Sequence, residues 1–337
     1  MSLLEVQDLH TEFRTRHGVV RAVDGVTFSV EPGETLALVG ESGCGKSATA
    51  MSIIGLLPGG TRGRVVQGTI QFEGRDLRSL SERQMEDVRG RDIGTIFQDP
   101  STSLNPSFTI GSHLVEALRR HSSLTKVQAR TRAVELLSEV RIPDPARRLD
   151  GYPHQLSGGM RQRVMIALAL ACGPRLLIAD EPTTALDVTI QAEILALLAR
   201  IREERRMSML LITHDMGVAA LTADRVAVMY AGQIVEHAAV SEVFAHPEHP
   251  YTEALMAAMP TVGGTNVRHG RLSAIGGAPP NLIDPPTHCR FADRCPHTRE
   301  ADGCTTSMPQ LQELRPGHWV RSFHAATERM REGSHAQ

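Results

Sequence analysis

Gly40-Glu41-Ser42-Gly43-Cys44-Gly45-Lys46-Ser47 is the stretch that decides the fold of this chain, and it directly follows the apolar run 35–39. Its G-x-x-x-x-G-K-[ST] spacing is that of a phosphate-binding loop. A strand, a glycine-rich turn and a helix that begins near Lys46 would direct backbone N–H groups and the helix N-terminus at phosphate. The pattern predicts a site for a nucleoside triphosphate with Mg²⁺. Standing alone, it would also suit a glycine-rich surface turn.

A second motif, Arg175-Leu176-Leu177-Ile178-Ala179-Asp180-Glu181-Pro182, is an apolar run that ends in two carboxylates. Apolar residues without alternation are typical of a central parallel strand covered by helices. At the carboxyl end of such a strand, Asp180 can hold Mg²⁺ and Glu181 can polarise the attacking water. A strand that ends in a solvated acidic turn is the plainer interpretation, but the phosphate loop in the same chain favours the catalytic one.

Three further stretches give the two motifs a family context. Leu156-Ser157-Gly158-Gly159-Met160-Arg161-Gln162-Arg163 resembles the LSGGQ-type signature that separates ATP-binding-cassette (ABC) ATPases from other phosphate-loop proteins. Gln98 resembles the glutamine of the family's Q-loop, Ala185-Leu186-Asp187 resembles the D-loop, and His214 resembles the switch histidine. The motifs follow the family's order within about the first 255 residues. The chain is therefore similar to an ABC ATPase.

This resemblance implies an α/β fold: an ABC-type P-loop ATPase core with an antiparallel β subdomain and a helical subdomain at about residues 100–172. The expected domains are a nucleotide-binding domain over 1–255 and a small loop-rich C-terminal extension over 256–337. Hydrophobic periodicity predicts helices over 47–57, 126–140 and 189–206, and a strand over 209–213. At 337 residues, the chain is long enough for one large domain with an appendage.

The resemblance also implies a role for each site residue, with ATP as the nucleotide. Lys46 and the loop amides would hold the β- and γ-phosphates, Glu181 would activate water, and His214 would contact the γ-phosphate. Ser157, Gly158 and Gly159 would complete the nucleotide site of the opposite subunit, with Asp187 at the shared interface. Ser47, Gln98 and Asp180 would surround Mg²⁺, and Gln98 would also act as a sensor in catalysis. Ala48 would lie beside the phosphates. Phe13 would either stack on adenine or be buried in the core.

Composition restricts the class of protein. The net charge is −2 with acidic and basic residues mixed, which gives no field that would favour a nucleic-acid partner. No apolar run approaches the ~18 residues of a membrane span, and the first eight residues lack the pattern of a secretory signal. We therefore expect a cytosolic chain. Because the five cysteines are odd in number and Cys44 lies inside the phosphate loop, a disulfide framework is not expected.

The C-terminal part resembles a narrower family. The segment 249–255, HPYTEAL, and the proline-rich segment 276–286 resemble the extension of oligopeptide and dipeptide permease ATPases, and the segment 158–167 resembles the D-type member of their paired D and F subunits. This implies a peptide importer with an F-type ATPase subunit in a heterodimer, two transmembrane permease subunits and an extracytoplasmic substrate-binding protein. The chain would lie at the cytoplasmic face of the plasma membrane. Nickel or glutathione import stays open, and a cytosolic ABC ATPase of translation or DNA repair is disfavoured because the chain has one cassette and no long basic insert.

Three cysteines in the tail raise a cofactor question. Cys289, Cys295 and Cys304 have the spacing C-x5-C-x8-C, and relatives with a fourth cysteine are associated with a [4Fe–4S] cluster. Ser322 occupies the place of that fourth thiolate here, so a cluster would need Ser322, His318 or His324 as a weaker fourth ligand. Zinc, and three packed thiols without metal, are the alternatives.

Overall fold

The computed structural model describes residues 2–57, 63–99, 103–184, 186–259 and 275–326. The chain divides into two compact units that are described separately. The first is formed by residues 1–4, 30–35 and 71–212, and the second by residues 5–29, 36–70 and 213–337. Ala185 of the expected D-loop lies outside the described residues.

A parallel group of strands forms the centre of the first unit. β7 (Leu176–Asp180) pairs in parallel with β6 (Ile93–Ile96) on one side and with β8 (Ser208–Thr213) on the other. Every residue of β7 is buried. Unbroken apolar sequence is what a strand with two neighbours and covered faces requires, so the predicted central parallel strand is confirmed. Asp180 stands at its carboxyl end, opposite Ile212.

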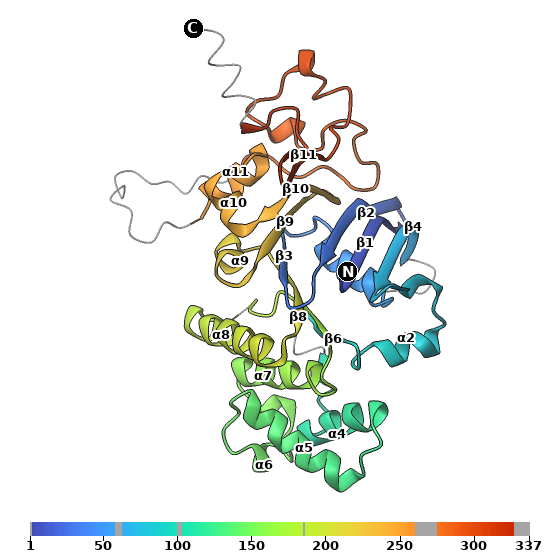
Figure 1. Ribbon diagram of the computed structural model, residues 1–337, viewed down its shortest axis with the longest axis vertical. Coiled ribbons are helices and arrows are strands. Elements are labelled where there is room, and N and C mark those ends of the chain that lie inside the picture. The colour runs from blue at the N-terminus through green and yellow to red at the C-terminus, as the bar shows by residue number, and fades with distance from the viewer. Residues whose placement is uncertain (1, 58–62, 100–102, 185, 260–274, 327–337) are drawn as a thin grey trace, which may run out of the picture. The chain divides into compact units, whose positions relative to one another are not determined.

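The helices of the first unit begin where polar side chains cap them. Thr109, Thr125, Ser157 and Asp187 each accept a hydrogen bond from a backbone N–H in the first turn of the helix that follows. Such caps satisfy N–H groups that have no partner within the helix. The helices are η1 (Leu77–Ser79), α2 (Glu82–Val88), α4 (Ile110–His121), α5 (Lys126–Glu139), α6 (Pro145–Arg148), η2 (Pro153–Gln155), α7 (Gly158–Ala169) and α8 (Val188–Arg205). In Figure 1, α4 to α7 pack together. The bounds of the helical subdomain, near residues 100–172, stay a prediction.

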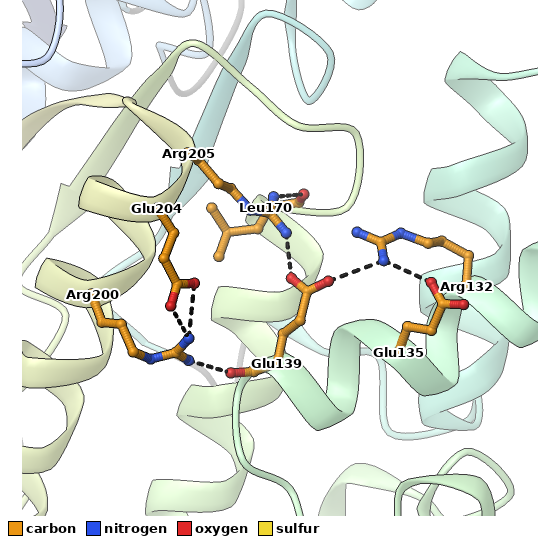
Figure 2. Close-up of polar contacts among 7 residues, drawn as sticks. All are labelled: Arg132, Glu135, Glu139, Leu170, Arg200, Glu204 and Arg205. Atoms are coloured by element: carbon orange, nitrogen blue, oxygen red, sulfur yellow. Dashed lines mark hydrogen bonds and ion pairs between the residues drawn. The ribbon is translucent and has the colours of Figure 1, made fainter.

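Charged side chains tie the C-terminal ends of α5, α7 and α8 together (Figure 2). The Glu139 carboxylate of α5 accepts from Arg132 at 3.0 Å and pairs with Arg205 of α8. Arg205 also donates to the carbonyl of Leu170, the C-cap of α7, at 3.0 Å. Arg200 donates to the backbone carbonyl of Glu139 at 2.7 Å. Arginine at a helix C-terminus satisfies free carbonyls and complements the helix dipole, so this network sets the positions of α7 and α8.

Two groups of strands build the second unit. β2 (Gly18–Val30), β1 (Leu4–Thr15) and β4 (Gly63–Phe72) are neighbours in one sheet. The last two residues of β4 belong to the first unit, where they pair antiparallel with β5 (Arg75–Asp76). In the other group, β3 (Thr35–Val39) is parallel to β9 (Arg225–Tyr230), and β9 is antiparallel to β10 (Gln233–Ala239). The helices of this unit are α1 (Lys46–Ile53), α9 (Met216–Thr222), α10 (Val240–Ala245), α11 (Pro250–Ala257), η3 (Ala292–Arg294) and η4 (Glu300–Asp302).

The C-terminal tail extends the second group of strands. β12 (His318–Val320) pairs antiparallel with β10, and β11 (Gln312–Arg315) pairs with β12. Phe291 of the tail is 2% exposed and makes edge contacts with the rings of Tyr230 and Tyr251. The tail therefore shares a hydrophobic core with β9 and α11, which its loop-rich composition did not indicate. The domain boundary at residue 255 stays a prediction.

Within the described part of the chain, every helix is too short or too polar to cross a lipid bilayer.

Candidate nucleotide site

The phosphate loop runs from the buried strand β3 into α1, as its sequence predicts. Gly43 and Gly45 have φ angles of 81° and 111°, which side chains with a Cβ rarely adopt. A Cβ on Gly40 would lie 2.1 Å from the carbonyl oxygen of Met229, and one on Gly45 would lie 2.2 Å from that of Ala22. The glycines are therefore required because neighbouring backbone closes tightly around the loop. α1 begins at Lys46, so its free N–H groups open toward the loop.

The Lys46 ammonium lies under the loop. It is 4% exposed, and its Nζ donates to the carbonyl of Gly40 at 2.7 Å and to that of Glu41 at 3.0 Å. These contacts hold the positive charge against the carbonyls at the start of the loop. An ammonium held in this way is suited to the charge of phosphate oxygens. Cys44, 3.9 Å from Nζ, is buried, and burial raises the pKa of its thiol.

The carboxylates of the second motif lie in the first unit. Asp180 is 3% exposed, and its carboxylate supplies the oxygen donors that Mg²⁺ prefers. Glu181 leaves the strand in a left-handed conformation with φ 46°, and its N–H donates to the carbonyl of Ile212 at 2.9 Å. Left-handed backbone at a non-glycine residue is costly and gathers at functional sites.

The Glu181 carboxylate is held by two side chains. Its Oε2 accepts from Gln98 Nε2 at 3.1 Å and from the Thr184 hydroxyl at 2.7 Å. The structure therefore brings together Gln98 and Glu181, which are 83 positions apart and were predicted from separate motifs. Thr184 was not predicted. A hydroxyl three residues after a catalytic carboxylate was the only signal that could have indicated it.

The signature residues mark the start of α7. The Ser157 hydroxyl accepts from Met160 N–H at 3.3 Å, and both Ser157 and Gly158 are exposed. A Cβ on Gly159 would lie 2.9 Å from the Ile190 side chain of α8, whose N-cap is Asp187. The predicted signature and D-loop residues therefore meet at the N-terminal ends of two neighbouring helices.

The remaining predicted residues lie in the second unit. His214 is exposed between β8 and α9, and the next residue, Asp215, caps α9 by accepting from Gly217 N–H at 2.7 Å. Phe13 is half-buried near the end of β1. Its contact with adenine stays a prediction. The phosphate loop and His214 belong to the second unit, whereas Gln98, Asp180, Glu181, Ser157 and Asp187 belong to the first.

The tail cysteines do not form the expected cluster site. Among the described residues, no three His, Cys, Asp or Glu side chains gather in a group that could hold a metal ion. His318 is 1% exposed and engages Glu236 at 2.8 Å, and His324 lies 3.2 Å from the Cys304 sulfur. Burial, together with the neighbouring Cys295 and Cys304 thiols, raises the pKa of Cys289 to about 11. Of the three expected fourth ligands, His318 is committed to Glu236, so it is not available to a [4Fe–4S] cluster in this arrangement.

Comparisons with known proteins agree with this geometry. Residues 23–184 match the family described as "ABC transporter", and residues 235–304 match "Oligopeptide/dipeptide transporter, C-terminal region". The chain is 53% identical to the probable peptide ABC transporter ATP-binding protein y4tR of Sinorhizobium fredii, over 94% of this chain and 93% of that protein. It is 50% identical to the dipeptide transport ATP-binding protein DppD of Bacillus subtilis, over 95% and 92%. A solved dimer of the ATP-binding cassette MJ0796 with ADP and Pi has a TM-score of 0.63 and 26% identity, over 70% of this chain and 98% of that chain.

Proposed function

Since this chain belongs to the ABC transporter family, in the branch of D-type oligopeptide and dipeptide transport ATP-binding proteins, we propose that it powers import of di- or oligopeptides by hydrolysing ATP. The observation that carries the catalytic part is the Glu181 carboxylate at the end of β7, held by Gln98 and Thr184. The names of the relatives, together with the match to the oligopeptide/dipeptide C-terminal region, support peptides as the transported solute.

The site residues divide the chemistry of hydrolysis among them. The loop amides and Lys46 bind the β- and γ-phosphates, and Ser47, Gln98 and Asp180 are the residues that would hold Mg²⁺. Mg²⁺, when bound, would neutralise charge on the phosphates. Glu181 orients the attacking water and accepts its proton, and Gln98 fixes the carboxylate that does so. His214 contacts the γ-phosphate. Each of these assignments follows the family's motifs onto the matching positions of this chain.

A single chain does not complete its own site in this proposal. Ser157, Gly158 and Gly159 act on the nucleotide of a second ATPase subunit, and Asp187 lies at the interface. The exposure of Ser157 and Gly158 at the start of α7 supports this arrangement. We take the second subunit to be a homologous F-type chain, so the working ATPase is a heterodimer. ATP binding closes the pair and product release opens it.

The partners follow from the family. Two transmembrane permease subunits convert closure of the ATPase pair into import, and an extracytoplasmic binding protein delivers the solute. The chain accordingly lies at the cytoplasmic face of the membrane as a peripheral subunit. No nucleic-acid partner is proposed. For the tail, we propose packed thiols in place of the [4Fe–4S] cluster, since no three metal-ligating side chains gather there among the described residues.

Transport by the assembled complex in sealed vesicles tests this function. ATP at the face that carries this chain should drive accumulation of a labelled dipeptide or oligopeptide, and a non-hydrolysable ATP analogue should not. Unlabelled peptides should compete for uptake, whereas Ni²⁺ and glutathione should not. Uptake of Ni²⁺ or glutathione with no uptake of any peptide would retain the ATPase and overturn the peptide assignment.

A further inference from the structure

Two side chains from the C-terminal part of the second unit hold Glu41, the second residue of the phosphate loop. Arg294 places Nη1 2.8 Å from Glu41 Oε2 and Nη2 2.9 Å from Oε1. The Tyr251 hydroxyl accepts the Glu41 backbone N–H at 3.0 Å. The carboxylate and the backbone of Glu41 are therefore both fixed by residues that follow it by 210 and 253 positions. No motif of the cassette accounts for either contact.

Arg294 is itself held in one orientation. Its side chain is 4% exposed, and its Nε donates to the carbonyl of Gly276 at 2.8 Å. Its guanidinium carbon lies 5.7 Å from the ring centroid of Tyr230 and 6.0 Å from that of Phe291, within the range of cation–π attraction. The hydrogen bonds to Glu41 raise the pKa of Arg294 further above its ordinary value. Arg294 is therefore a fixed, permanently charged partner of the loop, unlike a mobile surface arginine.

The charge of Glu41 matters because of what the loop binds. A carboxylate within the ~10 Å range of unscreened interaction opposes the negative charge of a triphosphate. The paired guanidinium cancels that charge with the two-pronged geometry that suits a carboxylate. The loop shape is linked to the same contact, since the Glu41 carbonyl accepts from Lys46 Nζ at 3.0 Å. Arg294 thus acts on the loop through Glu41, in both charge and position.

We propose that Arg294 is a positioning residue for the nucleotide site, through which the C-terminal extension raises the affinity of the cassette for ATP. It neutralises Glu41 and holds the phosphate loop in the conformation that accepts the phosphates. This inference rests on the proposed assignment of residues 40–47 to phosphate binding.

Calorimetric titration of MgATP into the full-length chain tests the proposal. Arg294→Met should raise the Kd about tenfold, within the range typical of coupling between sites. Arg294→Lys keeps the charge and loses the two-pronged contact, so it should raise the Kd about threefold. The double variant Glu41→Gln/Arg294→Met removes both charges and should return to within about threefold of the parent. Recovery in the double variant separates charge neutralisation from a general loss of folding.

Arg321→Met is the matched control. Arg321 is also a tail arginine, but its guanidinium donates to the carbonyls of Ile234 and Pro309. The Kd of the Arg321→Met variant for MgATP should stay within about twofold of the parent value, which is a change in binding free energy of the order of RT. Parent affinity in Arg294→Met would overturn the proposal. So would an equal loss in Arg321→Met with no recovery in the double variant. Lys46→Ala distinguishes a failure of this proposal from a failure of the proposed phosphate site. Parent affinity for MgATP in Lys46→Ala would overturn the assignment of the phosphate loop.

Discussion

Replacing Glu236 by alanine should destabilise the second unit severely, because this carboxylate joins three segments. Glu236 of β10 is 0% exposed. Its oxygens accept from the backbone N–H groups of Glu248 and His249, each at 2.9 Å, and contact Nε2 of His318 in β12 at 2.8 Å. The carboxylate thereby anchors the start of α11 and the added strand β12 to β10. Tyr251, which contacts the phosphate loop, lies two residues after His249.

The magnitude follows from the number of buried groups that lose their partner. Each buried donor left unpaired costs about 1–3 kcal/mol, and the three losses are not fully additive. We therefore expect Glu236→Ala to lower the free energy of unfolding by about 4 kcal/mol. Glu236→Gln keeps one acceptor oxygen but directs its NH₂ group at a donor, so the expected loss is about 2 kcal/mol. A whole domain has only about 5–15 kcal/mol to lose.

Urea unfolding of the full-length chain, followed by circular dichroism, measures both losses. The control is Glu242→Ala on the neighbouring helix α10, where the side chain is exposed and the expected change is below about 0.5 kcal/mol. A free energy of unfolding for Glu236→Ala within about 1 kcal/mol of the parent would refute the reasoning. It would mean that the hydrogen bonds to Glu236 contribute little to the attachment of α11 and β12.

Three further predictions concern the dimer, pH and the tail. Ser157→Arg in this chain should impair the nucleotide site of the partner's phosphate loop in site-resolved nucleotide trapping, and a loss confined to this chain's own loop would contradict the shared site. Burial, together with the charge of Arg225, lowers the pKa of His237 to about 4. Between pH 6.5 and 4 the unfolded chain therefore binds a proton that the folded chain does not bind. As the pH drops through this range, the free energy of unfolding should fall by up to about 3 kcal/mol, and His237→Asn should reduce this dependence on pH. Anaerobically purified protein should carry neither iron nor sulfide, and one cluster per chain by metal analysis would reverse the conclusion on Cys289, Cys295 and Cys304.

Local motifs were sufficient to predict the cassette. The glycines of the loop 40–47 indicate a tight turn followed by a helix, and the apolar run 176–180 indicates a buried parallel strand. In both cases a few consecutive residues are enough to predict the local structure. The capping residues Ser157 and Asp187 likewise act on the turn that follows them. The contact between Gln98 and Glu181 could be expected because both residues follow strands that pair in parallel.

Long-range contacts of the tail could not be predicted from the sequence. β12 has three residues, too few for a hydrophobic period, and its partner β10 lies about 80 residues earlier. The pair formed by Glu41 and Arg294 spans 253 positions, and nothing local to either residue indicates it. The cysteine spacing leaves the cofactor open for a related reason. Spacing along a loop-rich segment does not specify whether three sulfurs meet in a metal-binding group, and none is formed among the described residues.

Hydrolysis by a complex that carries Glu181→Gln tests the central claim most directly. Glutamine has the shape of glutamate and keeps an oxygen that can accept from Thr184, so the fold and ATP binding should persist. It cannot accept the proton of the attacking water. In vesicles that contain the assembled transporter, phosphate release and peptide uptake should therefore fall together by about 100-fold or more, with ATP affinity within about twofold of the parent. Phosphate release at the parent rate would contradict the account, because a group other than Glu181 would then activate the water.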